Sequence, residues 1–303
     1  MGSQHVLITG GASGLGFGCA QRFAALGFDV TLADIDLAAA QRAAAVLRNL
    51  QPGTDRIRVE ALDLADPASI AACAQRLMQQ GQAIDVLVNN AGIYPPSQRS
   101  LSTEGHELTF AIAHLGHFRL THALWPLLQR ADAARVISIS SLVQRQARLN
   151  LDDLSFERAY EPIRAYQQAK LSCLLFALEL QRRLDATGSR VASYAAHPGV
   201  CRTQIGRNRR RSPQDRLWQR LASATMAIGL RHVGQSPQQG AASVIEAATS
   251  ATLPRGAFVG PRWLMESCGP PVLITPGPAA RDAALAARLW SRTEALTGVR
   301  GWP

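Results

Sequence analysis

Residues 5–16 read HVLITGGASGLG, an apolar run followed by four glycines within seven positions. Glycine permits a tight turn and lets the backbone approach a phosphate group closely. A helix beginning near Gly14 would point its N-terminal amides and its dipole at the same phosphate. Because the turn follows an apolar run and precedes a helical pattern, it predicts a dinucleotide site rather than a purely structural turn. The residues expected to line this site are Gly10, Ser13, Gly14, Leu15 and Gly16.

The rest of the chain alternates short apolar runs with longer amphipathic stretches. The predicted strands cover residues 5–9, 29–33, 57–62, 84–88, 135–139, 190–195 and 257–259. The predicted helices cover residues 14–26, 37–50, 67–80, 105–130, 164–187, 236–250 and 279–297. Such alternation is typical of right-handed βαβ units. We therefore expect an α/β fold of the Rossmann type, with a doubly wound, mostly parallel seven-stranded sheet flanked by helices, in one domain over residues 1–303.

Two segments depart from this alternation. Residues 200–235 carry an arginine cluster and then an apolar, amphipathic stretch, and we interpret them as a lid inserted over the active site. The clustered arginines are Arg207, Arg209, Arg210 and Arg211. They fit recognition of an anionic substrate or acidic lipid headgroup, but a solvated loop is the favoured interpretation. Residues 255–278 are rich in glycine and proline and predict a loop-dominated tail around the last strand.

The composition bounds the class of protein. The chain has 303 residues and a formal net charge of +10. Its basic residues are spread widely outside the one cluster, which favours an arginine-rich background over a nucleic-acid partner. The five cysteines are odd in number and widely spaced, which argues against a disulfide framework or a zinc site. No signal peptide or membrane-spanning run is recognisable, so we expect a cytoplasmic protein without a metal.

An acidic residue stands at the end of the second predicted strand. Asp34 lies 18 residues after Gly16. A carboxylate there can accept hydrogen bonds from the adenosine ribose hydroxyls and would repel a 2′-phosphate. Ile35 follows in place of an arginine, which also favours NAD over NADP as cofactor. Asp34 could instead cap the helix that follows, although Asp36 could fill that role.

Asp63 and Leu64 directly follow the third predicted strand. At that edge of the sheet Asp63 could bind the amino group of adenine. It could equally be an ordinary loop aspartate, and the sequence leaves both alternatives open.

Tyr166 and Lys170 are four residues apart in a helical pattern and therefore share one helix face. A free tyrosine loses its proton only near pH ~10, and a neighbouring ammonium stabilises the tyrosinate. Tyr166 is thus a candidate acid/base toward a carbonyl or hydroxyl oxygen. Taken alone, such a pair is also common on the surface of any helix. Ser141 follows the fifth predicted strand, where its hydroxyl could donate to the same substrate oxygen.

Taken in order, these motifs resemble the short-chain dehydrogenase/reductase family, and its retinol dehydrogenase-like branch in particular. The motifs are TGGASGLG at 9–16, NNAG at 89–92, HLGHF at 114–118, Ser141, YQQAKL at 166–171, HPGV at 197–200, PQQGA at 237–241 and LW at 289–290. The resemblance covers nearly the whole chain. It implies an NAD(P)-dependent oxidoreductase that interconverts a hydroxyl and a carbonyl on a medium-to-large hydrophobic substrate.

The resemblance also implies roles for single residues. It makes Ser141, Tyr166 and Lys170 the catalytic residues, and it selects Ser141 over Ser140. Tyr166 and Lys170 would contact the cofactor as well. The other implied cofactor contacts are Asn90, Ala91, Gly92, Pro198, Gly199 and Thr203. By analogy, the helices predicted at 105–130 and 164–187 could form a homodimer interface.

One position departs from the family pattern. The family has an asparagine just before the HLGHF stretch, where it holds a water in a proton relay, and this chain has Ala113. A neighbouring group or rearranged waters could complete the relay, which we favour because the catalytic residues are kept. Alternatively, the protein is slow or catalyses a non-redox reaction, as a dehydratase, epimerase or cyclase, or it binds cofactor without turnover. His114 and His117 could substitute, but a histidine on a packed helix is more often structural.

Overall fold

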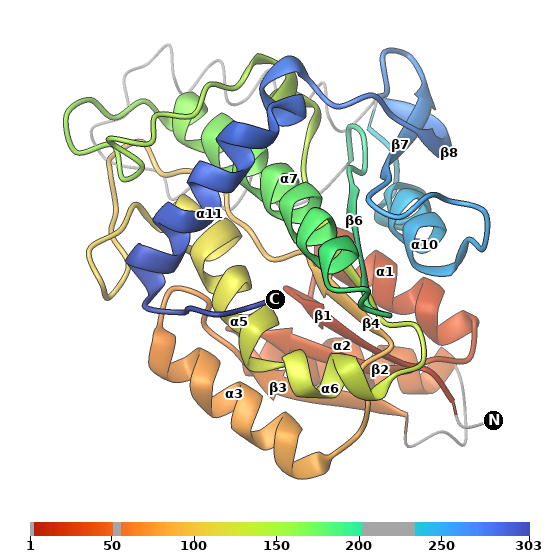
Figure 1. The fold of residues 1–303 in the computed structure, drawn as a ribbon. Helices are drawn as coiled ribbons and strands as arrows, with labels where there is room; N and C mark the ends of the chain where they lie inside the picture. Colours follow the sequence, from red (N-terminus) through yellow and green to blue (C-terminus); the bar gives the residue numbers. More distant parts are fainter. Residues whose placement is uncertain (1–2, 51–55, 202–233) are drawn as a thin grey trace.

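The computed structural model describes residues 3–50, 56–201 and 234–303. Its centre is an eight-stranded sheet in the order β3-β2-β1-β4-β5-β6-β7-β8 (Figure 1). The strands are β1 (His5–Thr9), β2 (Asp29–Asp34), β3 (Ile57–Ala61), β4 (Val86–Asn89), β5 (Arg135–Ile139), β6 (Ala192–Ala196), β7 (Phe258–Trp263) and β8 (Cys268–Leu273). The first seven strands are parallel, so their carboxyl ends meet at one edge of the sheet. The predicted Rossmann-type fold is confirmed.

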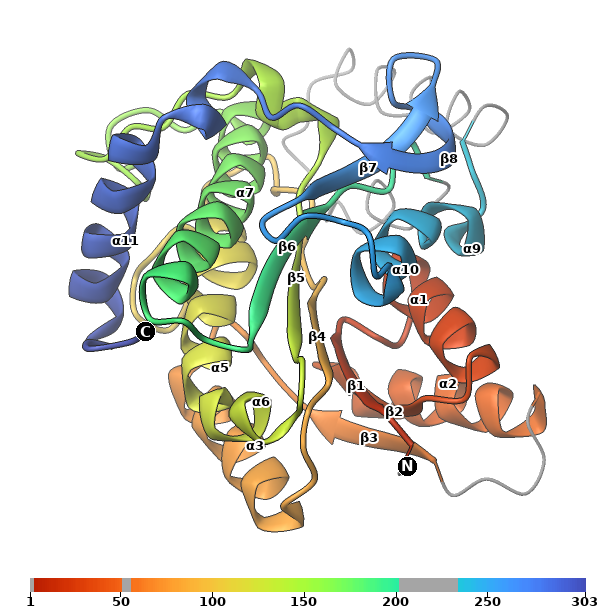
Figure 2. The ribbon, with the colours of Figure 1, turned by 45° about the vertical axis from the view of Figure 1, so that its right-hand side comes forward.

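Helices cover both faces of the sheet, as Figure 2 shows. On one face lie α1 (Gly14–Ala25), α2 (Leu37–Leu50), α9 (Pro237–Gly240) and α10 (Ala242–Thr249). On the other face lie α3 (Pro67–Gln80), α5 (His117–Ala123), α6 (Trp125–Arg130), α7 (Pro162–Ala186) and α11 (Ala283–Thr297). Each face buries its own apolar cluster against the sheet. Burial on both faces explains why the strands read as continuous apolar runs.

The eighth strand corrects the expectation of seven. β8 pairs antiparallel with β7, with Pro261 opposite Pro271, so residues 258–273 form a hairpin rather than a loop-dominated tail. Proline lacks a backbone donor and is tolerated only at edge strands, at strand starts or at bulges. β8 is the outermost strand, and the register shifts between Pro261 and Trp263. The prolines that disfavoured a strand in the sequence are therefore compatible with this one.

The helix expected over 105–130 is present over 108–130 but is irregular. It is divided into α4 (Leu108–Phe110), a π-helix η1 (Ala111–Gly116), α5 and α6. Glu107 precedes the first turn, and its carboxylate accepts the backbone N–H of Phe110 over 2.8 Å. At the end of the π-helix, a Cβ on Gly116 would overlap the carbonyl oxygen of Leu64. Close backbone approach thus accompanies the irregular turn.

The C-terminal helix α11 lies along α7 and α5 (Figure 1). Trp290 of α11 is 2% exposed, and its ring lies 4.8 Å from that of Phe118 and 5.9 Å from that of Phe176, centroid to centroid. This contact covers part of the helical face that the resemblance assigned to a homodimer. A dimer through that face would have to leave room for α11, and a homodimer remains a prediction.

Most of the proposed lid, including Thr203 and the cluster from Arg207 to Arg211, lies outside the described residues. The described residues also form two short 3-10 helices. One, η2 (Leu142–Gln146), follows β5, and the other, η4 (Pro278–Arg281), leads into α11. Within the described ranges, no helix is both long enough and apolar enough to cross a bilayer. All five cysteines are free.

Candidate active site

The predicted site residues gather at the carboxyl edge of the sheet. These residues lie at or just after the carboxyl ends of six neighbouring strands, in the order β3-β2-β1-β4-β5-β6. In that order the residues are Asp63 and Leu64, Asp34, Gly10, Asn90 to Gly92, Ser141, and Pro198 with Gly199. The strand order reverses between β1 and β4, and ligands of open α/β sheets bind at such a switch point.

The glycine turn between β1 and α1 is shaped to admit a phosphate. Gly10 and Gly14 have φ values of 63° and 54°, which side chains rarely adopt. A Cβ on Gly16 would overlap the carbonyl oxygen of Gly10. Ser13 precedes α1, is exposed, and makes no capping hydrogen bond through its hydroxyl. Leu15 is buried in the core beneath the turn, so the backbone amides and the Ser13 hydroxyl are the groups that a pyrophosphate would meet.

Asp34 lies against this turn. Its carboxylate accepts the backbone N–H of Ala12 over 3.0 Å and that of Asp36 over 3.1 Å. Asp36, in turn, accepts the N–H of Ala39 in the first turn of α2 over 2.8 Å. The helix-capping role that the sequence left open therefore belongs to Asp36. Asp34 is held beside the phosphate turn, where a ribose hydroxyl could also donate to its carboxylate.

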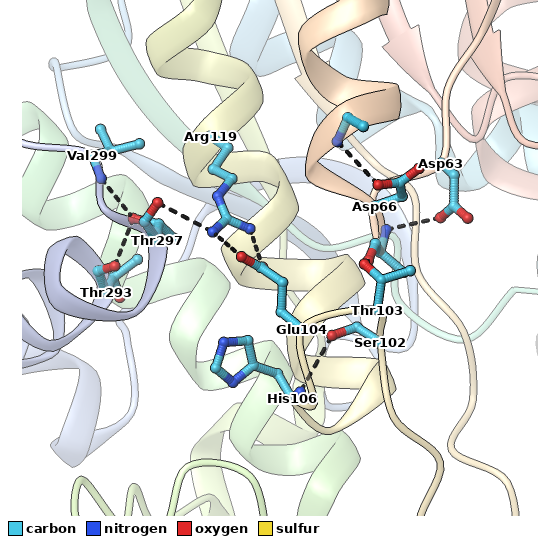
Figure 3. Close-up of polar contacts among 12 residues, drawn as sticks. Asp63, Asp66, Ser102, Thr103, Glu104, His106, Arg119, Thr293, Thr297 and Val299 are labelled. Carbon is cyan, nitrogen blue, oxygen red and sulfur yellow. Dashed lines mark hydrogen bonds and ion pairs between the residues drawn. The ribbon is translucent and has the colours of Figure 1, made fainter.

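Asp63 sits in a network that ties the loop after β3 to the loop before α4 and to helix α5 (Figure 3). Its Oδ1 accepts the N–H of Ala65 over 2.8 Å, and the Ala65 carbonyl accepts the Thr103 hydroxyl over 3.0 Å. Next to Thr103, the Glu104 carboxylate pairs with Arg119 of α5. Asp63 thus has a loop-forming role, and binding of adenine by its other oxygen remains a prediction. The buried Leu64 presents its carbonyl to Gly116.

Thr9, which the sequence did not single out, organises the segment after β4. Its buried hydroxyl oxygen accepts the N–H groups of Asn90 and Ala91 over 2.9 Å and 3.0 Å. The Asn90 amide donates to the Thr9 carbonyl over 2.7 Å. These bonds hold residues 90–92 next to the glycine turn. The only sequence signal for Thr9 was its place directly before the glycines.

Tyr166 and Lys170 of α7 face this same segment. The Tyr166 ring lies 5.4 Å from the ring of Tyr94, centroid to centroid. The buried Lys170 donates from Nζ to the Ile139 carbonyl over 3.0 Å, and a Cβ on Gly92 would lie 3.5 Å from Nζ. The spacing of the pair thus places both residues beside the carboxyl ends of β4 and β5. Tyr94 was missed because its proximity to Tyr166 depends on the tertiary fold.

The two serines after β5 have different environments. Ser140 is fully buried, and its hydroxyl donates to the Lys170 carbonyl over 2.8 Å. Ser141 is half-buried at the start of η2, and its hydroxyl makes no capping hydrogen bond. Its hydroxyl is therefore the one of the two with access to a ligand.

Ala113 lies in the π-helix and packs against Ala169 and Cys173 of α7. Its carbonyl accepts from Nδ1 of His117 over 3.0 Å and from Sγ of Cys173 over 3.2 Å. Both lone pairs of that oxygen are thus engaged. The Ala113 carbonyl oxygen therefore has no free lone pair to accept a hydrogen bond from a relay water.

His114 and His117 are structural in this arrangement. Nε2 of His117 lies 2.8 Å from the Thr9 hydroxyl, and Nε2 of His114 lies 2.7 Å from that of Thr293. Burial lowers the pKa of His117 to about 4, with a smaller contribution from the charge of Lys170. Burial likewise lowers the pKa of His114 to about 3. Both rings are therefore neutral near pH ~7 and serve as packed hydrogen-bonding groups.

The fold and this edge of the sheet are those of the α/β proteins that bind nucleotides at the carboxyl ends of their strands. The family model described as short chain dehydrogenase matches residues 4–214, and the chain belongs to the short-chain dehydrogenase/reductase family, in its retinol dehydrogenase-like branch. Among curated proteins, it is 33% identical to retinol dehydrogenase 14 of Mus musculus, over 99% of this chain and 87% of that one. It is 35% identical to polyprenol dehydrogenase of Mus musculus, over 97% and 84%.

A solved structure supports the same assignment. The crystal structure of an uncharacterized protein from Mycobacterium paratuberculosis is 34% identical, with a TM-score of 0.78 over 99% of this chain and 95% of that one. The match extends through the C-terminal region, beyond the part that the family model covers. The family resemblance predicted from the ordered motifs is confirmed.

Proposed function

We propose that the protein is an NAD-dependent dehydrogenase that interconverts a hydroxyl and a carbonyl on a medium-to-large hydrophobic molecule. The observation that carries the proposal is that one face of α7 places Lys170 beside Gly92 and Tyr166 beside Tyr94, both just beyond the end of β4. We further propose that residues 1–303 form a single nucleotide-binding domain, as one sheet runs through the described residues.

The catalytic chemistry follows from the side chains. In alcohol oxidation, the Tyr166 phenolate would take the proton of the substrate hydroxyl, and in ketone reduction the phenol would return it. The Lys170 ammonium stabilises the phenolate by its charge. The Ser141 hydroxyl would donate to the substrate oxygen and hold it in place. A bound nicotinamide supplies the acceptor or donor of the hydride on the substrate carbon.

The cofactor would be held along the sheet edge. The glycine turn would bind the pyrophosphate, Asp34 the adenosine ribose, and the segments at Asn90–Gly92 and Pro198–Gly199 the nicotinamide half. Lys170 would also bind the second ribose, and Thr203, outside the described residues, the carboxamide. NAD is favoured over NADP because the Asp34 carboxylate, fixed by two backbone amides, would repel a 2′-phosphate.

An apolar substrate is supported by the relatives. The names of the two curated dehydrogenases give retinol and polyprenol, both long apolar alcohols, as their substrates. The apolar lid stretch expected near 200–235 agrees with such a substrate. We also propose a cytoplasmic location, because five free thiols are typical of a reducing compartment.

The contacts of Ala113 favour a second candidate function. If its engaged carbonyl blocks proton exit from Lys170, the protein is a non-redox enzyme such as a dehydratase, epimerase or cyclase, or a cofactor-binding protein of low activity. A reaction that forms product without net change in the cofactor would support this alternative.

The experiment compares Tyr166→Phe with Tyr160→Phe. Tyr160 carries the same phenol nearby, but its hydroxyl donates to the Pro96 carbonyl over 2.9 Å. We expect Tyr166→Phe to abolish NAD reduction across a panel of long-chain alcohols while NADH binding is kept, and Tyr160→Phe to retain turnover. Full activity of Tyr166→Phe would remove that phenol from the mechanism. Thermal shifts with NAD, NADH, NADP and NADPH identify the cofactor.

A further inference from the structure

The turn between β7 and β8 has an unusual backbone. Leu264, Met265 and Glu266 have φ values of 50°, 53° and 64° in succession. The left-handed region is unfavourable for every residue with a Cβ, and consecutive non-glycine residues rarely adopt it. The hairpin lies beyond β6 at the carboxyl edge of the sheet (Figure 2). Strain of this kind persists only where surrounding contacts compensate for it.

The compensating contacts converge on Glu266. Its carboxylate forms an ion pair with Arg145 in η2, four residues after Ser141. The other carboxylate oxygen, Oε2, lies 3.3 Å from Nε2 of His197, the residue that follows β6. One side chain of the strained turn therefore contacts both η2, which follows Ser141, and the segment that leads into Pro198 and Gly199.

The contact between His197 and Glu266 brings a neutral ring close to a carboxylate. The Gly199 N–H donates to Nδ1 of His197 over 3.2 Å, so the proton of the neutral ring lies on Nε2. Burial, and then the charge of Arg145, lower the pKa of His197 to about 4, which keeps the ring neutral. Nε2 and Oε2 of Glu266 are both buried, and neither atom has a hydrogen-bond partner among the described residues. Their 3.3 Å approach is therefore a close polar contact without the alignment of a hydrogen bond.

The surrounding backbone packs closely around His197 and Gly199. A Cβ on Gly260 of β7 would overlap the His197 ring, and a Cβ on Gly199 would overlap the Ser267 carbonyl. That carbonyl accepts the N–H of Val200 over 2.9 Å. Gln235 donates to the carbonyls of Ser267 and Pro198 over 3.1 Å and 3.0 Å. The β7–β8 turn is thus joined to residues 198–200 by one backbone hydrogen bond and by the bridging side-chain amide of Gln235.

We propose that Glu266 is a positioning residue, which holds the Pro198–Gly199 segment through His197 and the Ser141 segment through Arg145 in the arrangement that receives the nicotinamide half of the cofactor. The inference rests on the proposed function, since it takes the Pro198–Gly199 segment as the nicotinamide side of the site. It assigns the strained turn a role in cofactor geometry rather than in stability alone.

The test is Glu266→Gln, compared with Glu157→Gln as a matched control. Glu157 is 73% exposed and only approaches Arg99 at 4.0 Å. We measure binding of NADH and of ADP-ribose, which lacks the nicotinamide, by calorimetry on the purified full chain. Glu266→Gln should weaken NADH binding about three- to tenfold. Its affinity for ADP-ribose should stay within about twofold, and Glu157→Gln should change neither.

Hydrogen exchange of peptides covering residues 142–147 and 197–201 gives a readout without cofactor. Both peptides should exchange faster in Glu266→Gln and remain at the wild-type rate in Glu157→Gln. If Glu266→Gln does not fold, Arg145→Gln takes its place, since the Arg145 side chain is 41% exposed, and Arg145→Lys should restore part of the NADH affinity.

Three outcomes overturn the inference. One is equal weakening of NADH and ADP-ribose binding, which indicates a general structural role. Another is unchanged NADH binding together with unchanged exchange in both peptides. In either case the wild-type protein still binds NADH and turns over substrate, so the proposed function stands. A wild-type protein that binds ADP-ribose but gains nothing from the nicotinamide overturns the proposed function itself, and with it this inference.

Discussion

The side-chain hydroxyl of Ser140 donates to the main-chain carbonyl of Lys170 over a distance of 2.8 Å. The bond links the end of β5 to the middle of α7, at the lysine whose ammonium lies beside Gly92. It also assigns different tasks to two adjacent serines. Ser140 joins strand and helix, and under the proposed function Ser141 would donate its hydroxyl to the substrate.

This division predicts that alanine substitution of Ser141 mainly lowers kcat, whereas alanine substitution of Ser140 mainly lowers stability. Ser141→Ala should lower kcat by about 10²- to 10³-fold, because a hydrogen bond to the reacting oxygen is lost. Its unfolding free energy should stay within about 0.5 kcal/mol of the wild type. Ser140→Ala should instead lower the unfolding free energy by about 1 kcal/mol through loss of a buried hydrogen bond. Urea denaturation and steady-state kinetics measure the two effects. A loss of stability in Ser141→Ala with unchanged kcat would reverse the assignment.

Asp34 should determine the choice between NAD and NADP. Asp34→Asn keeps a side-chain oxygen for the amide of Ala12 but removes the charge that a 2′-phosphate would meet. We expect the ratio of NADPH to NADH affinity to rise by about tenfold or more. Asp66→Asn is the control, since it removes the same charge at the N-cap of α3 and asparagine still caps a helix. An unchanged ratio in Asp34→Asn would exclude this carboxylate from cofactor selection.

Introducing the family asparagine at position 113 should raise neither the stability nor the turnover rate of this protein. Ala113 is 3% exposed and packs against Ala169 and Cys173. Ala113→Asn adds volume and an amide to a filled site, which should lower the unfolding free energy by about 1–3 kcal/mol. The turnover rate should not rise, because the carbonyl at 113 already accepts from His117 and Cys173.

The double variant Ala113→Asn/Cys173→Ala separates crowding from chemistry. Removing the thiol frees space and one lone pair of the carbonyl, so part of the lost stability should return. Kinetics and thermal unfolding of the single and double variants make the comparison. A rise in kcat of Ala113→Asn alone would show that the missing relay limits the wild-type enzyme.

The parts of the fold predicted from the sequence are those in which local pattern and burial agree. The glycine turn at 10–16, the buried parallel strands and the four-residue spacing from Tyr166 to Lys170 carry periodic or steric signals that need no distant partner. β8 was missed because its sequence, CGPPVL, contains two prolines. An outer antiparallel strand tolerates them, but only the whole sheet shows that β8 is outermost.

Contacts between distant segments account for the rest. Glu266 meets Arg145 across 121 positions, and Thr9 meets His117 across 108. Nothing periodic marks either pair, so no local pattern could connect them. The π-helix at 111–116 ends at another such contact, the close approach of Gly116 to the Leu64 carbonyl, which no local pattern marks either.

Acid should destabilise the protein through its buried histidines. His114 is fully enclosed, and burial lowers its pKa to about 3 from an unfolded value of 6.5. Below pH ~6.5 this histidine is protonated in the unfolded chain but stays neutral in the folded chain. Its full contribution to the unfolding free energy is therefore present above that pH and is lost as the pH falls toward the folded pKa. At pH 5 this one ring accounts for a loss of about 2 kcal/mol.

His114→Phe should remove this contribution. The Thr293 hydroxyl that Nε2 contacts also donates to the Leu289 carbonyl over 2.8 Å, and Nδ1 of His114 has no partner among the described residues, so the substitution leaves few groups unsatisfied. We expect a smaller fall in unfolding free energy between pH 8 and pH 5 than in the wild type, measured by urea denaturation at each pH. His122→Gln, which replaces a half-buried ring, should keep most of the wild-type slope. Equal slopes in His114→Phe and the wild type would mean that this histidine is protonated in the folded chain as readily as in the unfolded one.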